Sequence, residues 1–110
     1  MTELEEYYYY ENMKDLKLYH GTSSTLNISG KLLPPESTMT IREDFRTANK
    51  NVVFLTTSKL SALRYAIKAC AKFGGTPVVY QVSPDETLEH RLDNEYVCET
   101  ANIINIVTNI

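Results

Sequence analysis

The feature that most constrains the fold is one amphipathic segment, residues 58–75, with a short β-branched run on either side. Its apolar residues recur at helical spacing, and Arg64, Lys68 and Lys72 form the polar face. Ser58 can cap the first turn, and Gly74 with Gly75 can end the last. The segment predicts a single main helix built on apolar contacts from Ala62, Leu63, Ala66, Ile67, Cys70 and Phe73.

Short runs of β-branched and aromatic residues predict the strands. NVVFL (51–55) precedes the helix, PVVYQV (77–82) follows it, and residues 95–98 and 103–107 are also strand-like. Near the start, residues 16–19 alternate apolar and polar side chains. They then run into His20, Gly21 and Thr22, which we interpret as a strand entering a turn.

The order of these segments is β, loop, β, α, β, β, β, which predicts a small single-domain α+β fold. We expect an N-terminal arm over residues 1–14, which contains the run Tyr7–Tyr10, and one domain over 15–110. The polar residues 36–50 predict a long surface loop, and such loops often carry function. Residues 85–94, DETLEHRLDN, predict a polar linker.

Composition narrows the functional classes. The chain carries eleven basic and fourteen acidic residues, for a net charge of −3, and has no basic cluster of the kind that binds nucleic-acid phosphates. A basic protein or a small molecule is the more compatible partner. No signal-peptide pattern and no apolar run of about 20 residues is present, so we expect a soluble, cytoplasmic protein with no membrane partner. Cys70 and Cys98 predict free thiols and no disulfide framework.

Most familiar enzyme signatures are missing from the chain. There is no G-x-G-x-x-G motif after a strand, no phosphate-binding P-loop and no G-x-S-x-G motif. The two histidines and two cysteines lack the spacing of a metal site, so we expect no metal.

The segment Tyr19-His20-Gly21-Thr22 is the best candidate for chemistry. Histidine supplies a hydrogen-bond donor and an acceptor near neutral pH. The glycine allows close approach to a backbone N–H and C=O, which together match a planar carboxamide. On these residues alone, a turn histidine beside a structural glycine is the simpler interpretation.

Three segments together resemble the H-Y-E branch of ADP-ribosyltransferases, which includes poly(ADP-ribose) polymerases, diphtheria-type toxins and rifamycin ADP-ribosyltransferases. Tyr19-His20-Gly21-Thr22 looks like the first motif of that branch, and NVVFLTTSKLSALRYA is similar to the second. Asn94-Glu95-Tyr96-Val97 resembles the third, which holds the catalytic glutamate. The motifs occur in family order over residues 18–107. The resemblance implies a split β-sheet core, NAD⁺ as co-substrate and mono-ADP-ribosyl transfer.

The family's chemistry assigns roles to the matching residues. Breaking the nicotinamide–ribose bond builds positive charge on the ribose. By resemblance, Glu95 stabilises that charge and His20 binds a ribose hydroxyl. The same resemblance implies cofactor contacts from Gly21, Thr22 and Ser58. This interpretation requires that the turn after the first strand and the start of the strand at Glu95 meet across a pocket sized for nicotinamide riboside. An imidazole of His20 and a carboxylate of Glu95 on opposite sides of the molecule would contradict it.

The chain departs from the family at the stacking tyrosine of the second motif. That position falls on Val53 or Phe54, and Phe54 can stack through its π-face without a hydroxyl. Tyr65 matches a second aromatic of the polymerases. For both Phe54 and Tyr65, ordinary core packing is an equally good interpretation.

Other acids compete with Glu95 because rifamycin-modifying enzymes carry their key acid just after the strand equivalent to 77–82. The alternatives are Glu86, Glu89, Asp93 and Glu99. Arg42 and Arg46 can reach a diphosphate, although a solvated loop is the simpler interpretation.

Three functions remain open. The first is a mono-ADP-ribosyltransferase of the toxin, effector or resistance-enzyme kind. Its acceptor is left open among a protein, a small molecule and a nucleic acid, and the acidic charge favours the first two. The second is a module of the same fold that binds NAD⁺ or ADP-ribose without turnover. The third is a tRNA 2′-phosphotransferase, which the acidic charge and scattered arginines fit poorly.

Overall fold

Seven strands and one α-helix make up the part of the chain that the computed structural model describes, residues 16–26, 30–32 and 52–108. The expected N-terminal arm, the run Tyr7–Tyr10 and the loop 36–50 with Arg42 and Arg46 lie outside these residues. The elements in chain order are β1 (Leu18–Ser23), the short 3₁₀ helix η1 (Ser24–Leu26), β2 (Lys31–Leu32), β3 (Val53–Thr56), α3 (Lys59–Phe73), β4 (Pro77–Pro84), β5 (Glu89–Leu92), β6 (Glu95–Cys98) and β7 (Ala101–Val107).

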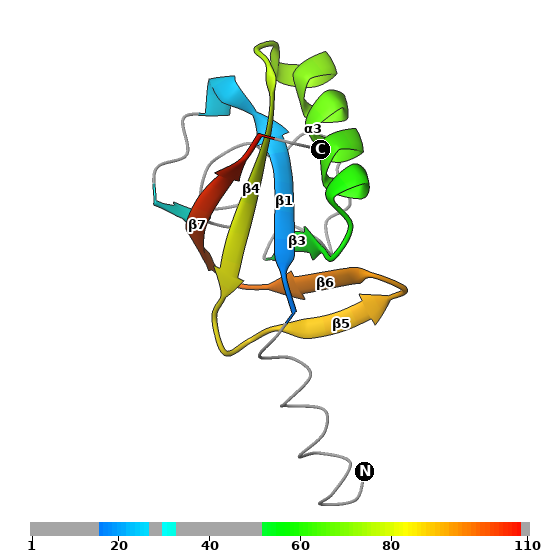
Figure 1. The fold of residues 1–110 in the computed structure, drawn as a ribbon, viewed down its shortest axis with the longest axis vertical. Coiled ribbons are helices and arrows are strands. Elements are labelled where there is room, and N and C mark those ends of the chain that lie inside the picture. The colour runs from blue at the N-terminus through cyan, green and yellow to red at the C-terminus, as the bar shows by residue number, and fades with distance from the viewer. Residues whose placement is uncertain (1–15, 27–29, 33–51, 109–110) are drawn as a thin grey trace, which may run out of the picture.

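The strands form one sheet in the order β2-β7-β4-β1-β3-β6-β5, and every neighbouring pair is antiparallel. The α+β prediction is confirmed. Figure 1 shows β5 and β6 running across the lower end of β1 and β4, so the two halves of the sheet have different directions. The halves join at β1 and β3, where Tyr19 and Thr56 are the one register pair among the described residues.

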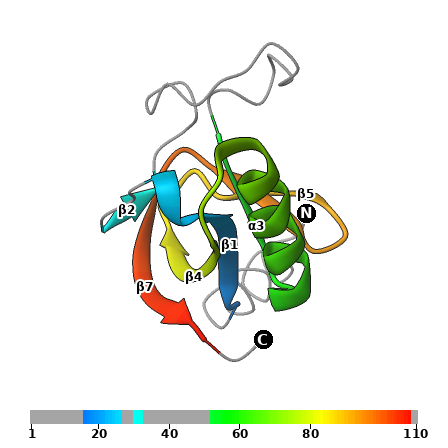
Figure 2. The same ribbon diagram turned by 90° about the horizontal axis from the view of Figure 1, so that it is seen from above.

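Helix α3 covers one face of β1 and β4 (Figure 2). It begins as predicted, because the Ser58 side chain accepts a hydrogen bond from the Ser61 N–H at 3.1 Å. It ends at Gly74, whose φ of 78° suits glycine and whose N–H donates to the Cys70 carbonyl at 2.8 Å. Ala62 and Ala66 are fully buried against the sheet.

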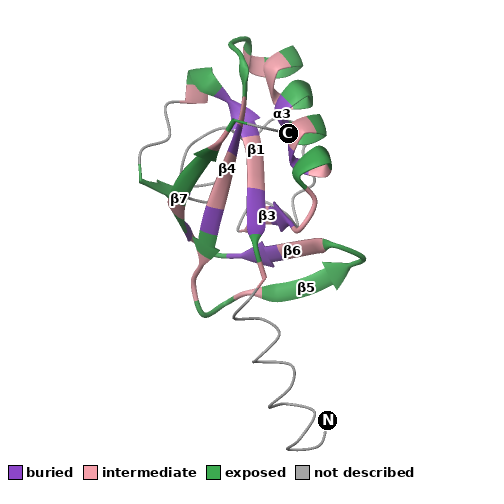
Figure 3. Cartoon of the chain, in the orientation of Figure 1, coloured by how far each residue is buried: buried purple, intermediate pink, exposed green. Residues whose placement is uncertain are grey.

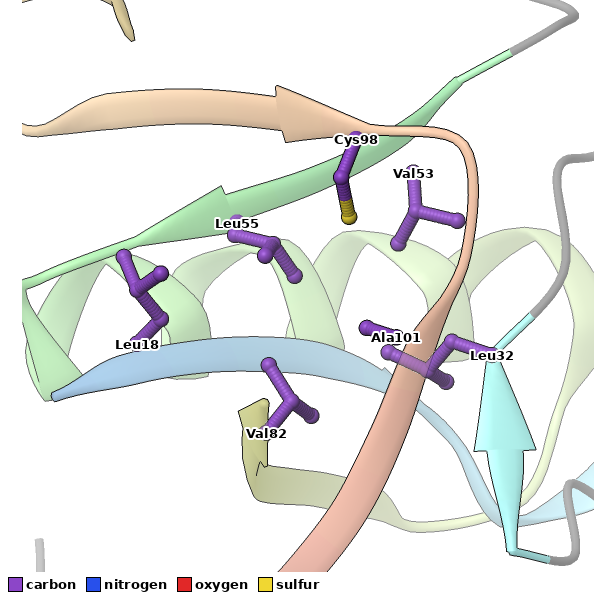
Figure 4. Close-up of a cluster of buried hydrophobic side chains, with 7 residues drawn as sticks. All are labelled: Leu18, Leu32, Val53, Leu55, Val82, Cys98 and Ala101. Atoms are coloured by element: carbon purple, nitrogen blue, oxygen red, sulfur yellow. The ribbon is translucent and has the colours of Figure 1, made fainter. Parts of the chain in front are cut away.

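Two groups of buried side chains hold the layers together, and Figure 3 shows burial concentrated along β1, β3 and the sheet side of α3. The cluster beneath α3 joins Tyr19, Ala62, Ala66 and Val79. The larger cluster lies on the opposite face of the sheet (Figure 4). Its members are Leu18, Leu32, Val53, Leu55, Val82, Cys98 and Ala101.

Two local predictions were wrong. The segment His20–Thr22 is not a turn, because β1 continues through Ser23 and pairs with β4 over its whole length. The expected linker contains strand β5, which forms a hairpin with β6. All four β5 residues are exposed, so pairing with β6 rather than burial stabilises it, and no apolar alternation marks it in the sequence.

Both cysteines are free thiols, as predicted, with Cys98 buried and Cys70 partly buried. Within the described ranges, no helix has the length and apolar character needed to cross a membrane.

Candidate functional site

The site is built around the point where the ladder between β1 and β3 stops. Tyr19 pairs with Thr56, so a continued antiparallel ladder would next bring Gly21 opposite Phe54. That pair does not form, although β1 remains paired with β4 and β3 remains paired with β6 at these positions. We call the position between Gly21 and Phe54 the β1–β3 break.

The direction of the β1 backbone follows from the β4 ladder. Ser24 donates its N–H to the Thr76 carbonyl at 2.9 Å and so extends the β1–β4 pairing by one residue. Hydrogen-bonded pairs alternate along an antiparallel ladder, so even-numbered residues of β1 bond to β4. Gly21 therefore turns its N–H and C=O toward the break.

The same reasoning gives the direction of β3. Thr57 donates its N–H to the Asn94 carbonyl at 3.1 Å, which extends the β3–β6 ladder. Odd-numbered residues of β3 therefore bond to β6, and Phe54 turns its N–H and C=O toward β1. Two strands thus direct backbone polar groups at the same break.

His20 bridges the break with its side chain. Its Nδ1 lies 2.8 Å from the Phe54 carbonyl oxygen. A carbonyl accepts only, so Nδ1 carries the proton, and in the neutral ring Nε2 is left as an acceptor. Desolvation by burial lowers the pKa of His20, against the opposing effect of the bond to Phe54, and so favours the neutral ring.

Gly21 is required by packing against α3. A Cβ built on this residue would lie 1.7 Å from the Ala62 carbonyl oxygen and 3.0 Å from the Ala66 nitrogen. Packing therefore explains why residue 21 is glycine: α3 lies so close to its Cα that no side chain fits. Its N–H and C=O lie in the plane of the sheet and are directed at the break.

Of the two strand residues proposed for aromatic stacking, Val53 and Phe54, the structure leaves Phe54 the more exposed. Val53 belongs to the large cluster opposite α3 and is buried. Side chains alternate along a strand, so Phe54 lies on the α3 face, where it is partly exposed.

Tyr65 is exposed on α3. Leu63 packs against the cluster that includes Val79 of β4, and Tyr65, two residues later, lies about 200° around the helix. Tyr65 therefore lies on the other flank of α3, toward the β3 side of β1. The Lys68 ammonium stands 5.8 Å from the centre of its ring.

Glu95 is the first residue of β6 and is directly opposite Thr56, which is itself opposite Tyr19. The three residues form one cross-strand row on the α3 face, and Glu95 lies two strand spacings, about 10 Å, from Tyr19. Because side chains alternate along a strand, the His20 side chain leaves β1 on the face opposite α3. The two predicted catalytic side chains therefore leave the sheet on opposite faces, His20 from β1 and Glu95 from β6, and this disagrees with the expectation that both line one pocket.

The competing acids lie outside the ladder between β3 and β6. Glu86 is exposed between β4 and β5, and Glu89 on β5 pairs with Arg91 at 3.8 Å. Asp93 stands at the hairpin turn, where its carbonyl lies 2.6 Å from His90 Nε2. Glu99 follows β6 and is exposed. Among these acids, Glu95 is the one in register with β3.

Two other predicted contacts have structural roles. Ser58 caps α3. Thr22 is buried, and alternation places it with Leu18 on the face opposite α3.

The sequence interpretation missed Thr56, which lies between Tyr19 and Glu95 in the cross-strand row. The Thr56 hydroxyl accepts the Ser58 N–H at 3.1 Å. The sequence did contain a signal for Thr56: it is a polar residue at the end of a buried strand, two positions before the helix cap Ser58.

In comparisons with known proteins, no family model matches the chain and no significant match to a curated protein was found.

Proposed function

We propose that the chain is a mono-ADP-ribosyltransferase that cleaves NAD⁺ at the nicotinamide–ribose bond. The observation that carries the proposal is the β1–β3 break, where His20 replaces a ladder bond to Phe54 and the Gly21 backbone groups are directed at β3. Glu95, Phe54 and Tyr65 all lie on the α3 side of this break.

The break suits the nicotinamide end of NAD⁺. A carboxamide has one donor and one acceptor in a plane, which complement the C=O and N–H of Gly21. Phe54 from the strand and Tyr65 from the helix supply aromatic faces on the same side of the sheet. These contacts would fix the leaving group.

His20 supplies an acceptor for a ribose hydroxyl. Its Nδ1–H is committed to the Phe54 carbonyl, so Nε2 of the neutral ring is the atom that accepts. The lowered pKa of His20 keeps this acceptor available at neutral pH.

Glu95 supplies negative charge where the reaction develops positive charge. As the C1′–N bond breaks, its electron pair leaves with nicotinamide and the ribose acquires oxocarbenium character. A carboxylate beside the ribose stabilises that state and can take the proton of the attacking acceptor. The acceptor then bonds to C1′, and the released proton passes to the carboxylate or to water.

The test is nicotinamide release from NAD⁺ by wild type and Glu95→Gln. We expect the variant to lose at least about 10²-fold in rate, as when a transition-state contact is removed. Glu99→Gln is the matched control, because Glu99 is an exposed glutamate four residues away. Equal rates for wild type and Glu95→Gln would contradict the assignment of Glu95.

A second candidate is a module that binds NAD⁺ or ADP-ribose without cleaving it. It is favoured by Phe54 at the tyrosine position and by the opposite faces from which His20 and Glu95 leave the sheet. Calorimetry separates the candidates, because saturable NAD⁺ binding by wild type with no nicotinamide release would select the module.

A further inference from the structure

The side of α3 that faces away from the sheet is exposed along the helix (Figure 3). Successive helical residues are about 100° apart, so this side lies opposite the buried Ala62 and Ala66. We call its residues the outer stripe of α3. They are Leu60, Arg64, Ile67, Lys68 and Ala71, and all five are exposed.

The outer stripe carries two large apolar side chains. Leu60 and Ile67 are seven residues apart and each is 53% exposed. The sequence predicted Ile67 as an apolar contact of the helix, and the structure corrects this. Helix α3 packs so closely on β1 through Ala62 and Ala66 that its buried strip is narrow, and Ile67, about 100° from Ala66, falls outside it.

The charges of α3 are all of one sign. The helix carries four of the chain's eleven basic residues and none of its fourteen acidic ones. Arg64 and Lys68 are four residues apart, a spacing at which like charges repel and destabilise a helix. Within the described ranges, neither side chain forms an ion pair. The outer stripe therefore combines uncompensated positive charge with exposed apolar side chains, in a chain that is acidic as a whole.

We propose that the outer stripe of α3 binds an acidic amphipathic helix of a partner protein. Leu60, Arg64, Ile67 and Ala71 are separated by four, three and four residues, the spacing at which two helices pack along a common seam. A helix with apolar residues at the same spacing covers Leu60 and Ile67. Aspartate or glutamate beside those residues pairs with Arg64 and Lys68.

Other occupants match the outer stripe less well. A second copy of the chain would bring Arg64 and Lys68 against the same cations. A helix that lies on a membrane needs a broad apolar face, whereas here a cation lies between Leu60 and Ile67. The combination of a narrow apolar seam and adjacent positive charge selects an acidic helix.

This inference does not depend on the proposed function. Peptide binding to the outer stripe is measured without NAD⁺, and nicotinamide release is measured without the peptide. Failure of one therefore leaves the result of the other intact.

The experiment measures binding of a fluorescein-labelled synthetic peptide to the full chain by fluorescence anisotropy. The peptide spans about three heptads, with leucine at the a and d positions and glutamate at the flanking positions. We expect saturable binding that weakens about tenfold from low to high salt, because part of the attraction is ionic. A peptide with lysine in place of glutamate should not bind. Absence of saturable binding by the acidic peptide overturns the proposal, and so does equal binding of the lysine peptide.

Charge reversal locates the bound peptide. Arg64→Glu combined with Lys68→Glu should weaken binding at least about tenfold, since like charges then face the peptide. The matched control is Lys17→Glu combined with Lys31→Glu, which changes the net charge equally at two exposed lysines outside α3 and should bind nearly as wild type does. Equal losses in the two double variants would overturn the assignment to the outer stripe. If circular dichroism shows that the α3 variant is unfolded, Arg64→Gln combined with Lys68→Gln takes its place, with a loss in the same direction.

The apolar contact has its own test. Ile67→Ala should weaken peptide binding about tenfold, as expected for loss of a buried aliphatic contact. Leu92→Ala is the control, because Leu92 is 67% exposed on β5, and it should leave the affinity unchanged. If Ile67→Ala binds as wild type does, the contact is purely ionic and the proposed helix seam is wrong.

Two competing occupants are tested directly. Sedimentation of wild type, but not of the Arg64→Glu, Lys68→Glu variant, with vesicles containing phosphatidylserine would replace the partner helix by a lipid surface and overturn the proposal. Residues 1–15 contain five acidic residues and one basic residue, so the chain's own N-terminal residues are the other competitor. A variant with Glu3→Gln, Glu5→Gln and Glu6→Gln should bind the peptide as wild type does. Affinity at least about tenfold tighter in that variant would assign the outer stripe to the chain's own N-terminal residues.

Discussion

The Nδ1 atom of His20 lies 2.8 Å from the carbonyl oxygen of Phe54, in the position where a backbone N–H of β1 would bond if the ladder continued. A side-chain hydrogen bond thus takes the place of one backbone hydrogen bond between the two halves of the sheet. The replacement keeps the halves joined while the Gly21 backbone groups remain directed at the β1–β3 break.

The burial of His20 makes stability depend on the protonation of its ring. Burial lowers the pKa of His20 in the folded chain below its ordinary value of about 6.5, so the unfolded chain binds the proton more tightly. The contribution to stability is fully present above about pH 6.5 and is lost as pH falls through the lowered pKa. Urea unfolding of wild type between about pH 7.5 and 5 should show this loss, and His20→Gln should flatten it. If the unfolding free energy of His20→Gln depends on pH as steeply as that of wild type, a group other than His20 causes the dependence.

Gly21→Ala should destabilise the fold strongly. The new Cβ would meet the Ala62 carbonyl at 1.7 Å, so α3 must move away from β1, at a cost of about 3 kcal/mol or more. Gly30→Ala is the control, because its φ of +79° strains alanine but no atom lies within 4 Å. We expect that control to cost about 1 kcal/mol. Chemical denaturation measures both, and equal losses would refute the packing explanation.

Asp85 ties the turn after β4 to the turn after β6. Its carboxylate accepts the N–H and hydroxyl of Thr87, and also those of Thr100 at 3.0 and 2.9 Å. Burial acts to raise the pKa of Asp85, but these hydrogen bonds outweigh it, and the pKa is lowered. Asp85→Ala should cost about 1–2 kcal/mol at neutral pH, while Glu86→Ala, next to it and exposed, should cost almost nothing. The wild-type advantage should be present above about pH 4 and fall as Asp85 is protonated. A constant advantage down to strongly acid pH would contradict this account.

The two cysteines should differ sharply in reactivity. Burial, with a further contribution from the Asp85 charge, raises the pKa of Cys98 to about 12. Very little of the Cys98 thiol is ionised near pH 8, and the side chain is enclosed in the large cluster. Iodoacetamide should therefore modify Cys70 in the native chain and Cys98 only after unfolding, as followed by peptide mass spectrometry. Rapid native labelling of Cys98 would show that the cluster opens.

The sequence predicted the elements that rely on local patterns. The cap at Ser58, the end at Gly74 and the strands on either side of α3 are signalled by side chains close in sequence. Strand β5 was missed because its four residues are exposed and its stability comes from pairing with β6, which no local pattern records.

The residues of the candidate site remain a prediction from motif order, whereas their arrangement follows from the sheet. Motif order brought His20, Phe54 and Glu95 together, and the sheet places their strands β1, β3 and β6 side by side. The break depends on which ladder pairs form and which are absent, a relation between residues far apart in the chain. For the same reason the sequence left two interpretations of Gly21 open. Its missing side chain can serve close packing, and its backbone N–H and C=O can serve ligand binding.

The aromatic pair offers the last test of the site. Phe54 and Tyr65 lie on the α3 side of the break, so both should stack with a nicotinamide ring held by Gly21. Tyr65→Ala should weaken NAD⁺ binding about tenfold, the value of one aromatic contact, whereas Tyr65→Phe should bind as wild type does. Ile67→Ala, on an outward position of the same helix, is the matched control and should leave affinity unchanged. Calorimetry with NAD⁺ measures all four proteins, using Glu95→Gln as the background so that turnover does not consume the ligand. If Tyr65→Ala and Ile67→Ala bind alike, the ring of Tyr65 does not contact the nicotinamide, and Phe54→Ala then tests whether the strand side of the break holds it alone.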